Sequence, residues 1–216
     1  KTIVTTELAA AIAHSYGIEI MNVLTGFKYI GEKMTEFAKT GDHTYLIGFE
    51  ESYGYLVGTH ARDKDGVVAT MLIAEMAAYY KTKGKSLYEA LMDIYKKYGY
   101  YSEKTVSFVM PGKDGMEKMS QLLTDLRQTP PTKVAGMDVV LYTDYQSQTI
   151  KDTKGNVSPL KVLKYNLSDE KTYFIVRPSG TEPKIKLYLG TFAESFETAE
   201  KTIEKVLEDC KKQLGL

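Results

Sequence analysis

One short turn near the end of the chain gathers the types of side chain that bind anions. It reads Arg-Pro-Ser-Gly-Thr-Glu-Pro-Lys from Arg177 to Lys184 and separates two apolar runs typical of strands. The Arg177 guanidinium offers a planar pair of donors that matches phosphate, and the hydroxyls of Ser179 and Thr181 add short hydrogen bonds. Gly180 lets successive backbone N–H groups turn toward one anion, and Lys184 adds a second cation. These eight residues, called the anion loop below, predict an oxyanion-binding turn, although Pro, Ser and Gly are also ordinary hairpin residues.

A second polar group follows directly after an apolar run in the first half of the chain. It reads Gly-Phe-Glu-Glu-Ser-Tyr-Gly-Tyr from Gly48 to Tyr55. Ligand groups in α/β proteins gather where strands end. Carboxylates accept hydrogen bonds from hydroxyls, so adjacent acids with a serine and aromatic rings suit a sugar. The same composition also fits a solvated acidic loop.

Composition and charge exclude several classes of protein. The 216 residues are 43% hydrophobic and 26% charged, with a formal net charge of +0, which gives no electrostatic reason to expect nucleic acid or an anionic membrane as a partner. No apolar run approaches the ~20 residues that span a bilayer. The single cysteine, Cys210, excludes an internal disulfide, and the histidines His14, His43 and His60 lack metal-site spacing. We therefore expect a cytoplasmic protein without metal ligands in this chain.

Apolar runs and helical periodicity alternate over the first hundred residues, which predicts an α/β domain with a mixed or parallel sheet. The expected strands are Thr2–Thr6, Ile18–Val23 and Tyr45–Phe49. The expected helices are Glu7–Tyr16, one between Gly26 and Gly41, one capped by Asp65 and running to Tyr80, and one opened by a Ser86–Glu89 capping box.

The pattern changes after about residue 100, where strands predominate. The predicted order is a strand at Thr105–Met110, a helix at Asp114–Arg127, three or four strands with turns at Gly155–Asn156 and at the anion loop, and a helix from about Ala193 to Gln213. This order predicts an α+β domain with an antiparallel sheet. We place the two domains at residues 1–100 and 101–216.

Several separated motifs resemble the α-D-phosphohexomutases, the family of phosphoglucomutase and phosphomannomutase. The anion loop resembles that family's phosphate-binding loop nearly letter for letter. The acidic loop, a Thr-Gly pair at Thr25 and the run Arg-Asp-Lys-Asp-Gly from Arg62 also match, in the family's order, so the resemblance covers essentially the whole chain.

The resemblance implies a role for individual residues. It implies that Glu50 and Ser52 bind sugar hydroxyls, that Thr25 and Gly26 lie beside the sugar, and that Lys64 assists proton transfer. It also implies that the anion loop holds the substrate's phosphate. For Thr25, a helix N-cap remains an alternative that does not exclude the first role.

The resemblance also implies an architecture of four domains around a cleft. Domain one supplies a serine that cycles through phosphoserine, and domain two supplies three aspartates that hold Mg²⁺; neither motif occurs here. We therefore interpret residues 1–100 as domain three, perhaps without its first helix, and residues 101–216 as domain four, with a fold similar to the TATA-binding protein. The strand-like start without Met suggests a fragment.

The implied activity is the interconversion of glucose 1-phosphate and glucose 6-phosphate, with Mg²⁺ as cofactor and glucose 1,6-bisphosphate as intermediate. The implied partners are a hexose phosphate and the remaining domains of the same protein. A phosphopentomutase, a phosphomannomutase or a non-catalytic sugar-phosphate binding module are the alternatives. Without the serine and the metal loop, this chain alone is expected to be inactive.

Overall fold

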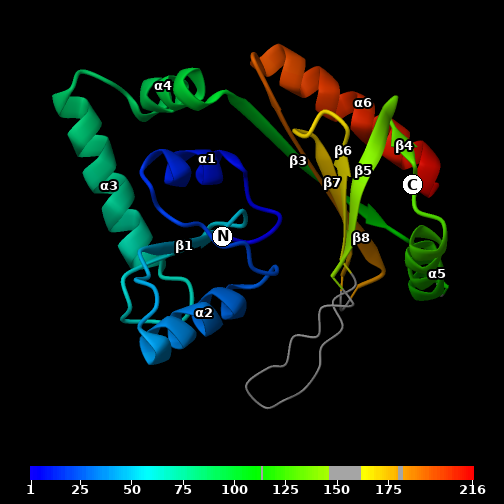
Figure 1. Ribbon diagram of the computed structural model, residues 1–216, viewed down its shortest axis with the longest axis horizontal. Helices are drawn as coiled ribbons and strands as arrows, with labels where there is room; N and C mark the ends of the chain where they lie inside the picture. Colours follow the sequence, from blue (N-terminus) through cyan, green and yellow to red (C-terminus); the bar gives the residue numbers. More distant parts are fainter. Residues whose placement is uncertain (113, 146–161, 180–181) are drawn as a thin grey trace. The chain divides into compact units, whose positions relative to one another are not determined.

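The computed structural model describes residues 1–112, 114–145, 162–179 and 182–216 (Figure 1). The chain divides into two compact units, Lys1–Gly99 and Tyr100–Leu216, which are described in turn. Within the described ranges, no helix combines the length and the apolar character needed to cross a membrane.

The first unit packs helices around a short hairpin. Its helices are α1 (Leu8–Ser15), α2 (Phe27–Thr40), α3 (Gly66–Thr82) and α4 (Leu87–Tyr98), and its hairpin pairs β1 (Ile47–Glu50) antiparallel with β2 (Gly54–Val57). The helix predicted between Gly26 and Gly41 is confirmed as α2, and its residues Phe27, Ile30 and Met34 form a buried cluster with Leu56 of β2.

The strands of the first unit differ from those predicted. Residues 2–6 and 18–23 form only an isolated parallel bridge between Thr2 and Val23, so the prediction of two full strands there is wrong. Conversely, β2 was not among the strands expected from the sequence. Its alternating burial is hidden in the sequence because Gly54, an inward position, has no side chain to signal it.

The predicted caps of α3 and α4 are confirmed. The Asp65 carboxylate accepts hydrogen bonds from the backbone N–H groups of Val67 and Val68 at 2.9 and 3.1 Å. Ser86 and Glu89 form the reciprocal capping box. Although α3 is rich in apolar residues, none of them is buried against the described part of the chain.

The second unit is an antiparallel sheet in the strand order β3-β8-β7-β6-β5-β4. Its strands are β3 (Tyr100–Val109), β4 (Lys133–Val134), β5 (Met137–Asp144), β6 (Leu163–Leu167), β7 (Tyr173–Pro178) and β8 (Lys184–Ala193). The turn predicted at Gly155–Asn156 lies outside the described residues. The anion loop joins β7 to β8, as the flanking apolar runs predicted.

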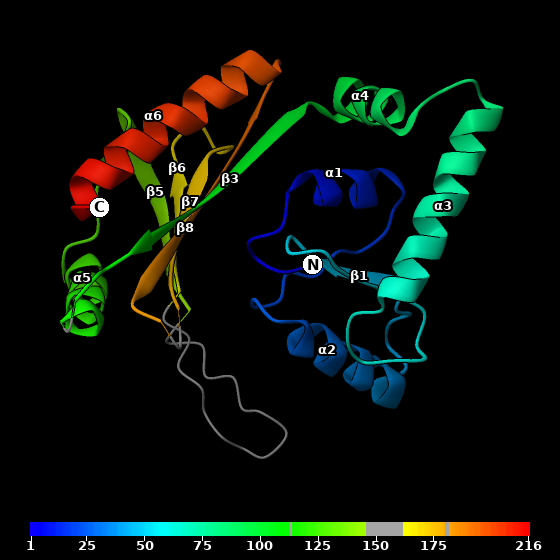
Figure 2. The same cartoon turned by 180° about the vertical axis from the view of Figure 1, so that it is seen from behind.

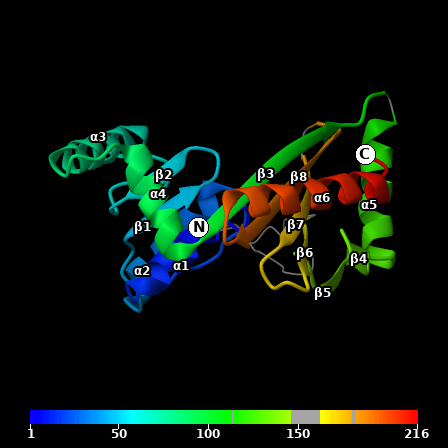
Figure 3. The same cartoon turned by 90° about the horizontal axis from the view of Figure 1, so that it is seen from above.

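Two helices bury their apolar faces in the same core as this sheet. Figures 2 and 3 show α6 (Phe196–Leu214) beside β3 and β8, and α5 (Gly115–Gln128) contributes Met119, Leu123 and Leu126 to the shared cluster. Cys210 lies in that core, and burial raises the pKa of its thiol to about 12. The predicted fold class, an α/β domain followed by an antiparallel α+β domain, is confirmed.

A histidine after α2 provides a pH-dependent contact in the first unit. His43 Nε2 lies 3.2 Å from Glu19 Oε2, and its Nδ1 lies 3.2 Å from Asp42 Oδ1. Hydrogen bonding to Asp42, assisted by Glu19, raises the pKa of His43. The imidazolium therefore stabilises the folded state below the ordinary pKa of about 6.5, and this contribution disappears as pH rises through the raised value.

We expect His43→Gln to reduce stability at about pH 6 more than at about pH 9, because the lost contacts need the protonated ring. The measurement is the free energy of urea unfolding of wild type and variant across that range. His14→Gln, in an exposed part of α1, is the control and should give a constant difference. A constant difference for His43→Gln as well would show that these contacts do not stabilise the fold.

Candidate functional site

A hydrogen bond joins the Thr-Gly pair to the acidic loop. The carboxylate of Glu50, the last residue of β1, accepts at Oε1 from the backbone N–H of Gly26 at 2.9 Å. Gly26 precedes α2 with φ 124°, a region that favours glycine because side chains with a Cβ clash there. The turn before α2 thus holds Glu50 in a defined orientation.

Lys64 lies against the same carboxylate. A Cβ atom added to Gly54 would stand 2.6 Å from Lys64 Cδ and 3.2 Å from Glu50 Oε2, so the lysine stem passes close over this glycine. Lys64 Nζ lies 2.8 Å from Asp63 Oδ1. The hydrogen bond that Lys64 donates to the Asp63 carboxylate, with a smaller contribution from the charge of Glu50, raises the pKa of Lys64. Lys64 is therefore an ammonium at neutral pH.

Ser52 lies at the exposed turn between β1 and β2 and donates to Glu51 Oε1 at 3.0 Å. The other oxygen of Glu51 accepts from the buried Thr2 hydroxyl at 3.5 Å. Tyr53 follows with φ 60°, a left-handed conformation that costs a residue with a side chain roughly 1–3 kcal/mol. Glu51, which was not among the predicted site residues, therefore connects the loop to the core. Its position next to Ser52 was the signal that could have found it.

Thr25 does not cap α2, so that alternative is wrong. The N-cap position belongs to Gly26, without a side-chain capping bond. The Thr25 hydroxyl oxygen is buried and, among the described residues, has no hydrogen-bond partner. A buried hydroxyl without a partner costs about 1–3 kcal/mol, a cost that is more often tolerated at functional sites.

In the second unit, hydrogen bonds across the hairpin shape the anion loop. Ser179 N donates to the carbonyl of Lys184 at 2.7 Å. Arg177, near the end of β7, donates from Nη1 to the Tyr188 hydroxyl at 3.2 Å, and Lys184 Nζ lies 2.6 Å from Glu182 Oε2. The described part of the loop thus carries two cationic side chains, one oriented by a tyrosine.

The remaining residues of the predicted phosphate site, Gly180 and Thr181, lie outside the described residues. No group of three or more His, Cys, Asp or Glu within the described ranges is arranged to hold a metal ion. A cavity of about 690 Å³ in the first unit is lined by other residues, and none of Thr25, Gly26, Glu50, Ser52 and Lys64 contributes to it.

Curated relatives of this chain are phosphoglucomutases. The phosphoglucomutase of Staphylococcus saprophyticus is 35% identical over 208 residues, a match covering 94% of this chain and 38% of the relative. That of Staphylococcus haemolyticus is 32% identical over 209 residues, covering 94% and 37%. The chain thus spans well under half the length of these relatives.

Solved structures share the fold. The open form of Paramecium parafusin, an exocytosis-sensitive phosphoprotein described as a phosphoglucomutase, has a TM-score of 0.69 at 22% identity and covers 99% of this chain and 37% of that one. A protein from Thermus thermophilus that is assigned as a phosphomannomutase has a TM-score of 0.61 at 18% identity. The match covers 100% of this chain and 36% of that one. Residues 1–98 match the family model for the phosphoglucomutase/phosphomannomutase α/β/α domain III. Residues 1–98 match this domain, and the curated phosphoglucomutases match nearly the whole length of the chain. The chain therefore belongs to the α-D-phosphohexomutase family.

Proposed function

We propose that this chain is the substrate-binding part of a phosphoglucomutase. In this proposal, residues 1–100 are domain three and residues 101–216 are domain four, and the whole protein interconverts glucose 1-phosphate and glucose 6-phosphate through glucose 1,6-bisphosphate. The observation that carries the proposal is the 2.9 Å bond between Gly26 N and Glu50 Oε1, with Lys64 beside the same carboxylate. It unites motifs that are far apart in the sequence.

Glu50 and Ser52 are the proposed sugar-binding residues, with Thr25 and Gly26 beside them. Because Gly26 N–H holds one oxygen of Glu50, the carboxylate is pre-oriented to accept from a sugar hydroxyl with its other oxygen. The buried hydroxyl of Thr25 is a further polar group, on the residue before Gly26, whose N–H binds the Glu50 carboxylate. A phosphoserine enzyme that turns its bisphosphate around must bind the sugar in two orientations, which hydroxyl-directed hydrogen bonds permit.

Lys64 is proposed as the proton donor. Its raised pKa keeps the ammonium charged, and its contact with Asp63 holds it near Glu50 until a more basic oxygen competes. A developing alkoxide or bridging phosphate oxygen is such an acceptor. Lys64 would donate a hydrogen bond or a proton to it.

Arg177, Ser179, Gly180, Thr181 and Lys184 are proposed to hold the phosphate that does not react. Phosphate binding would recruit Lys184 from Glu182, while Tyr188 keeps the Arg177 guanidinium in position. A fixed phosphate limits how far the reacting oxygen can move, and misplacement by about 1 Å costs roughly 10²-fold in rate.

Mg²⁺ and the phosphoserine are assigned, as part of this proposal, to other domains of a longer protein in the cytoplasm. The metal would supply charge stabilisation for the transferred phosphoryl group.

The test of the function is turnover by the full-length protein of glucose 1-phosphate, mannose 1-phosphate and ribose 1-phosphate, measured as kcat/KM. The proposal expects glucose 1-phosphate to be the best of the three. A preference for ribose 1-phosphate would indicate a phosphopentomutase, and a preference for mannose 1-phosphate would indicate a phosphomannomutase. If the protein turned over none of the three substrates, the remaining alternative would be a non-catalytic sugar-phosphate binding module.

The close packing at Gly54 provides a separate test. A methyl group in Gly54→Ala would displace the Lys64 stem, because its Cβ lies only 2.6 Å from Lys64 Cδ. We expect kcat of the full-length enzyme to fall roughly tenfold, less than the ~10²-fold cost of a 1 Å misplacement, with little change in Tm. Gly66→Ala is the control, because a Cβ there meets no atom within 4 Å. An unchanged kcat in Gly54→Ala would contradict the proposal that Lys64 takes part in the reaction.

A further inference from the structure

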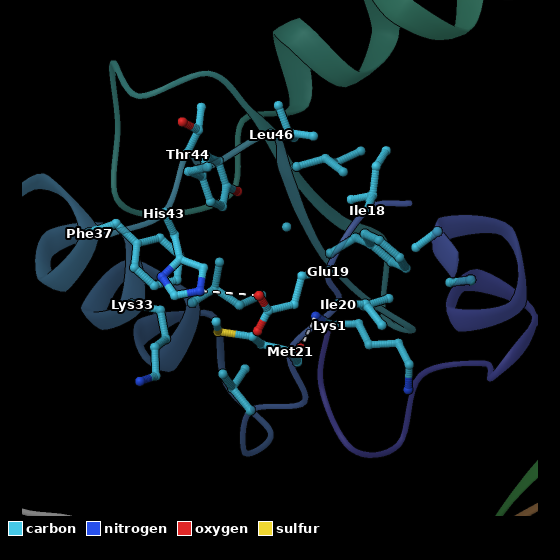
Figure 4. A pocket seen from close by; sticks show the side chains of 18 of the residues that line it. Lys1, Ile18, Glu19, Ile20, Met21, Lys33, Phe37, His43, Thr44 and Leu46 are labelled. Carbon is cyan, nitrogen blue, oxygen red and sulfur yellow. Dashed lines mark hydrogen bonds and ion pairs between the residues drawn. The ribbon is translucent and has the colours of Figure 1, made fainter. Parts of the chain in front are cut away.

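One side of α2 faces the segment between β2 and α3. Phe27, Gly31 and Thr35 follow one another at intervals of four residues, a spacing that places them on the same side of a helix. We call these three residues the α2 stripe. Lys33 and Phe37 lie on a different side of α2 and line the cavity of about 690 Å³ (Figure 4). The α2 stripe is thus separate from the cavity lining.

The guanidinium of Arg62 attaches the segment to the α2 stripe. Its Nε donates to Thr35 Oγ1 at 3.3 Å, and its Nη1 donates to the carbonyl oxygens of Thr59 at 2.8 Å and Ala61 at 2.9 Å. The Thr35 hydroxyl in turn donates to the Gly31 carbonyl at 2.9 Å, which orients its oxygen. One side chain therefore closes the turn before Arg62 and joins that turn to a helix.

Gly31 lets the backbone of Arg62 approach α2 closely. A Cβ atom added to Gly31 would stand 2.5 Å from the Arg62 carbonyl oxygen, closer than real Cβ contacts. The preceding residue, Ala61, packs against the buried cluster that includes Phe27. The position of Arg62 is thus set twice, by the hydrogen bonds of its side chain and by the packing of its backbone.

Lys64 lies two residues beyond Arg62, between two fixed points of the chain. One is the contact of Arg62 with α2, and the other is the hydrogen bond from Asp65 N to the Tyr55 carbonyl at 2.8 Å. The Lys64 ammonium nitrogen stands 5.5 Å from the centroid of the Phe27 ring, within the range of a cation–π contact. The helix side that receives Arg62 therefore also receives Lys64.

We propose that Arg62 is a positioning residue that acts through Lys64. The pair of Arg62 and Thr35 holds the backbone before Lys64 and so keeps its ammonium over Phe27 and its stem beside Glu50. This inference rests on the proposed role of Lys64 as proton donor and needs no contact between Arg62 and the substrate. Placement matters because a shift of about 1 Å costs roughly 10²-fold in rate.

The test is a double-mutant cycle in the full-length enzyme, with kcat for glucose 1-phosphate as the readout. Arg62→Met keeps a long stem but loses the donors, and we expect kcat to fall about tenfold. In a Lys64→Met background the same change should have no further effect, because the residue that Arg62 positions is gone. Arg62→Lys keeps the charge without the planar fork and should recover only part of kcat.

A matched pair of threonine variants tests the contact with α2. Thr35→Val removes the hydroxyl that accepts from Arg62, and we expect kcat to fall about threefold, with no further loss in an Arg62→Met background. Thr202→Val is the control and should leave kcat unchanged. Its hydroxyl makes the same 2.9 Å bond to the carbonyl four residues earlier, but on α6 of the second unit.

A physical measurement accompanies the kinetics. Amide exchange at residues 59–64 should become about fivefold faster or more in Arg62→Met, with little change in Tm. Wild-type kcat in Arg62→Met, or an equal loss in both backgrounds, would overturn the positioning role alone. Wild-type kcat in Lys64→Met would contradict the proposed role of Lys64, and the inference would fall with it.

Discussion

Arg177→Ala in the full-length enzyme is expected to lower kcat/KM for glucose 1-phosphate by about 10³-fold with little change in Tm. The guanidinium is near the end of β7, and its one described contact is the hydrogen bond to Tyr188 at 3.2 Å. Losing the fork that holds a phosphate removes about 4 kcal/mol of binding, which corresponds to this factor. Steady-state kinetics with thermal unfolding measures both quantities.

Matched variants separate the phosphate role from general effects of arginine. Arg177→Lys keeps the charge but loses the planar fork, so it should recover only part of the activity. Arg127→Ala removes an arginine of the same unit that pairs with Asp144 at 2.8 Å, and should lower Tm without a specific loss of kcat/KM. Activity of Arg177→Ala within a few-fold of wild type would contradict the assignment of the anion loop.

Glu50→Gln should lower kcat/KM by about 10²-fold and weaken the preference between sugars, while binding of inorganic phosphate stays unchanged. The glutamine carbonyl can still accept from Gly26 N, so the turn before α2 should keep its structure. The loss comes from the charge, because hydrogen bonds to charged groups contribute about 1.5–3 kcal/mol. The measurement is kcat/KM for glucose 1-phosphate against mannose 1-phosphate.

The control for Glu50→Gln is Glu75→Gln on the exposed surface of α3, which makes the same change of charge away from the acidic loop. It should leave both kinetic constants unchanged. If Glu50→Gln keeps the sugar preference of wild type, Glu50 supports the turn structurally and does not select the sugar.

Local chemistry made several features predictable from sequence. The capping residues Asp65 and Ser86 act within three residues of the bonds they make, and the apolar face of α6 follows from its period. The hairpin at the anion loop follows from two apolar runs around turn residues. In each case the signal and the structure occupy the same short segment.

The strands at residues 2–6 and 18–23 show why other features could not be read in this way. Their apolar runs are typical of strands, but a strand needs a partner along its whole length, and the ladder here consists of one bridge. For the same reason α3 forms as predicted but remains unburied, because periodicity does not reveal what a helix packs against.

The candidate sites divide along the same line. Residue types and their order identified the motifs around Glu50, Lys64 and Arg177, because the sequence states directly which side chains carry a carboxylate, an ammonium or a guanidinium group. That Gly26 N–H holds Glu50, that Asp63 raises the pKa of Lys64, and that Glu51 reaches Thr2 became visible only in three dimensions. Hydrogen bonds and charge interactions depend on distances of a few ångströms between segments up to 49 residues apart, and folding sets those distances.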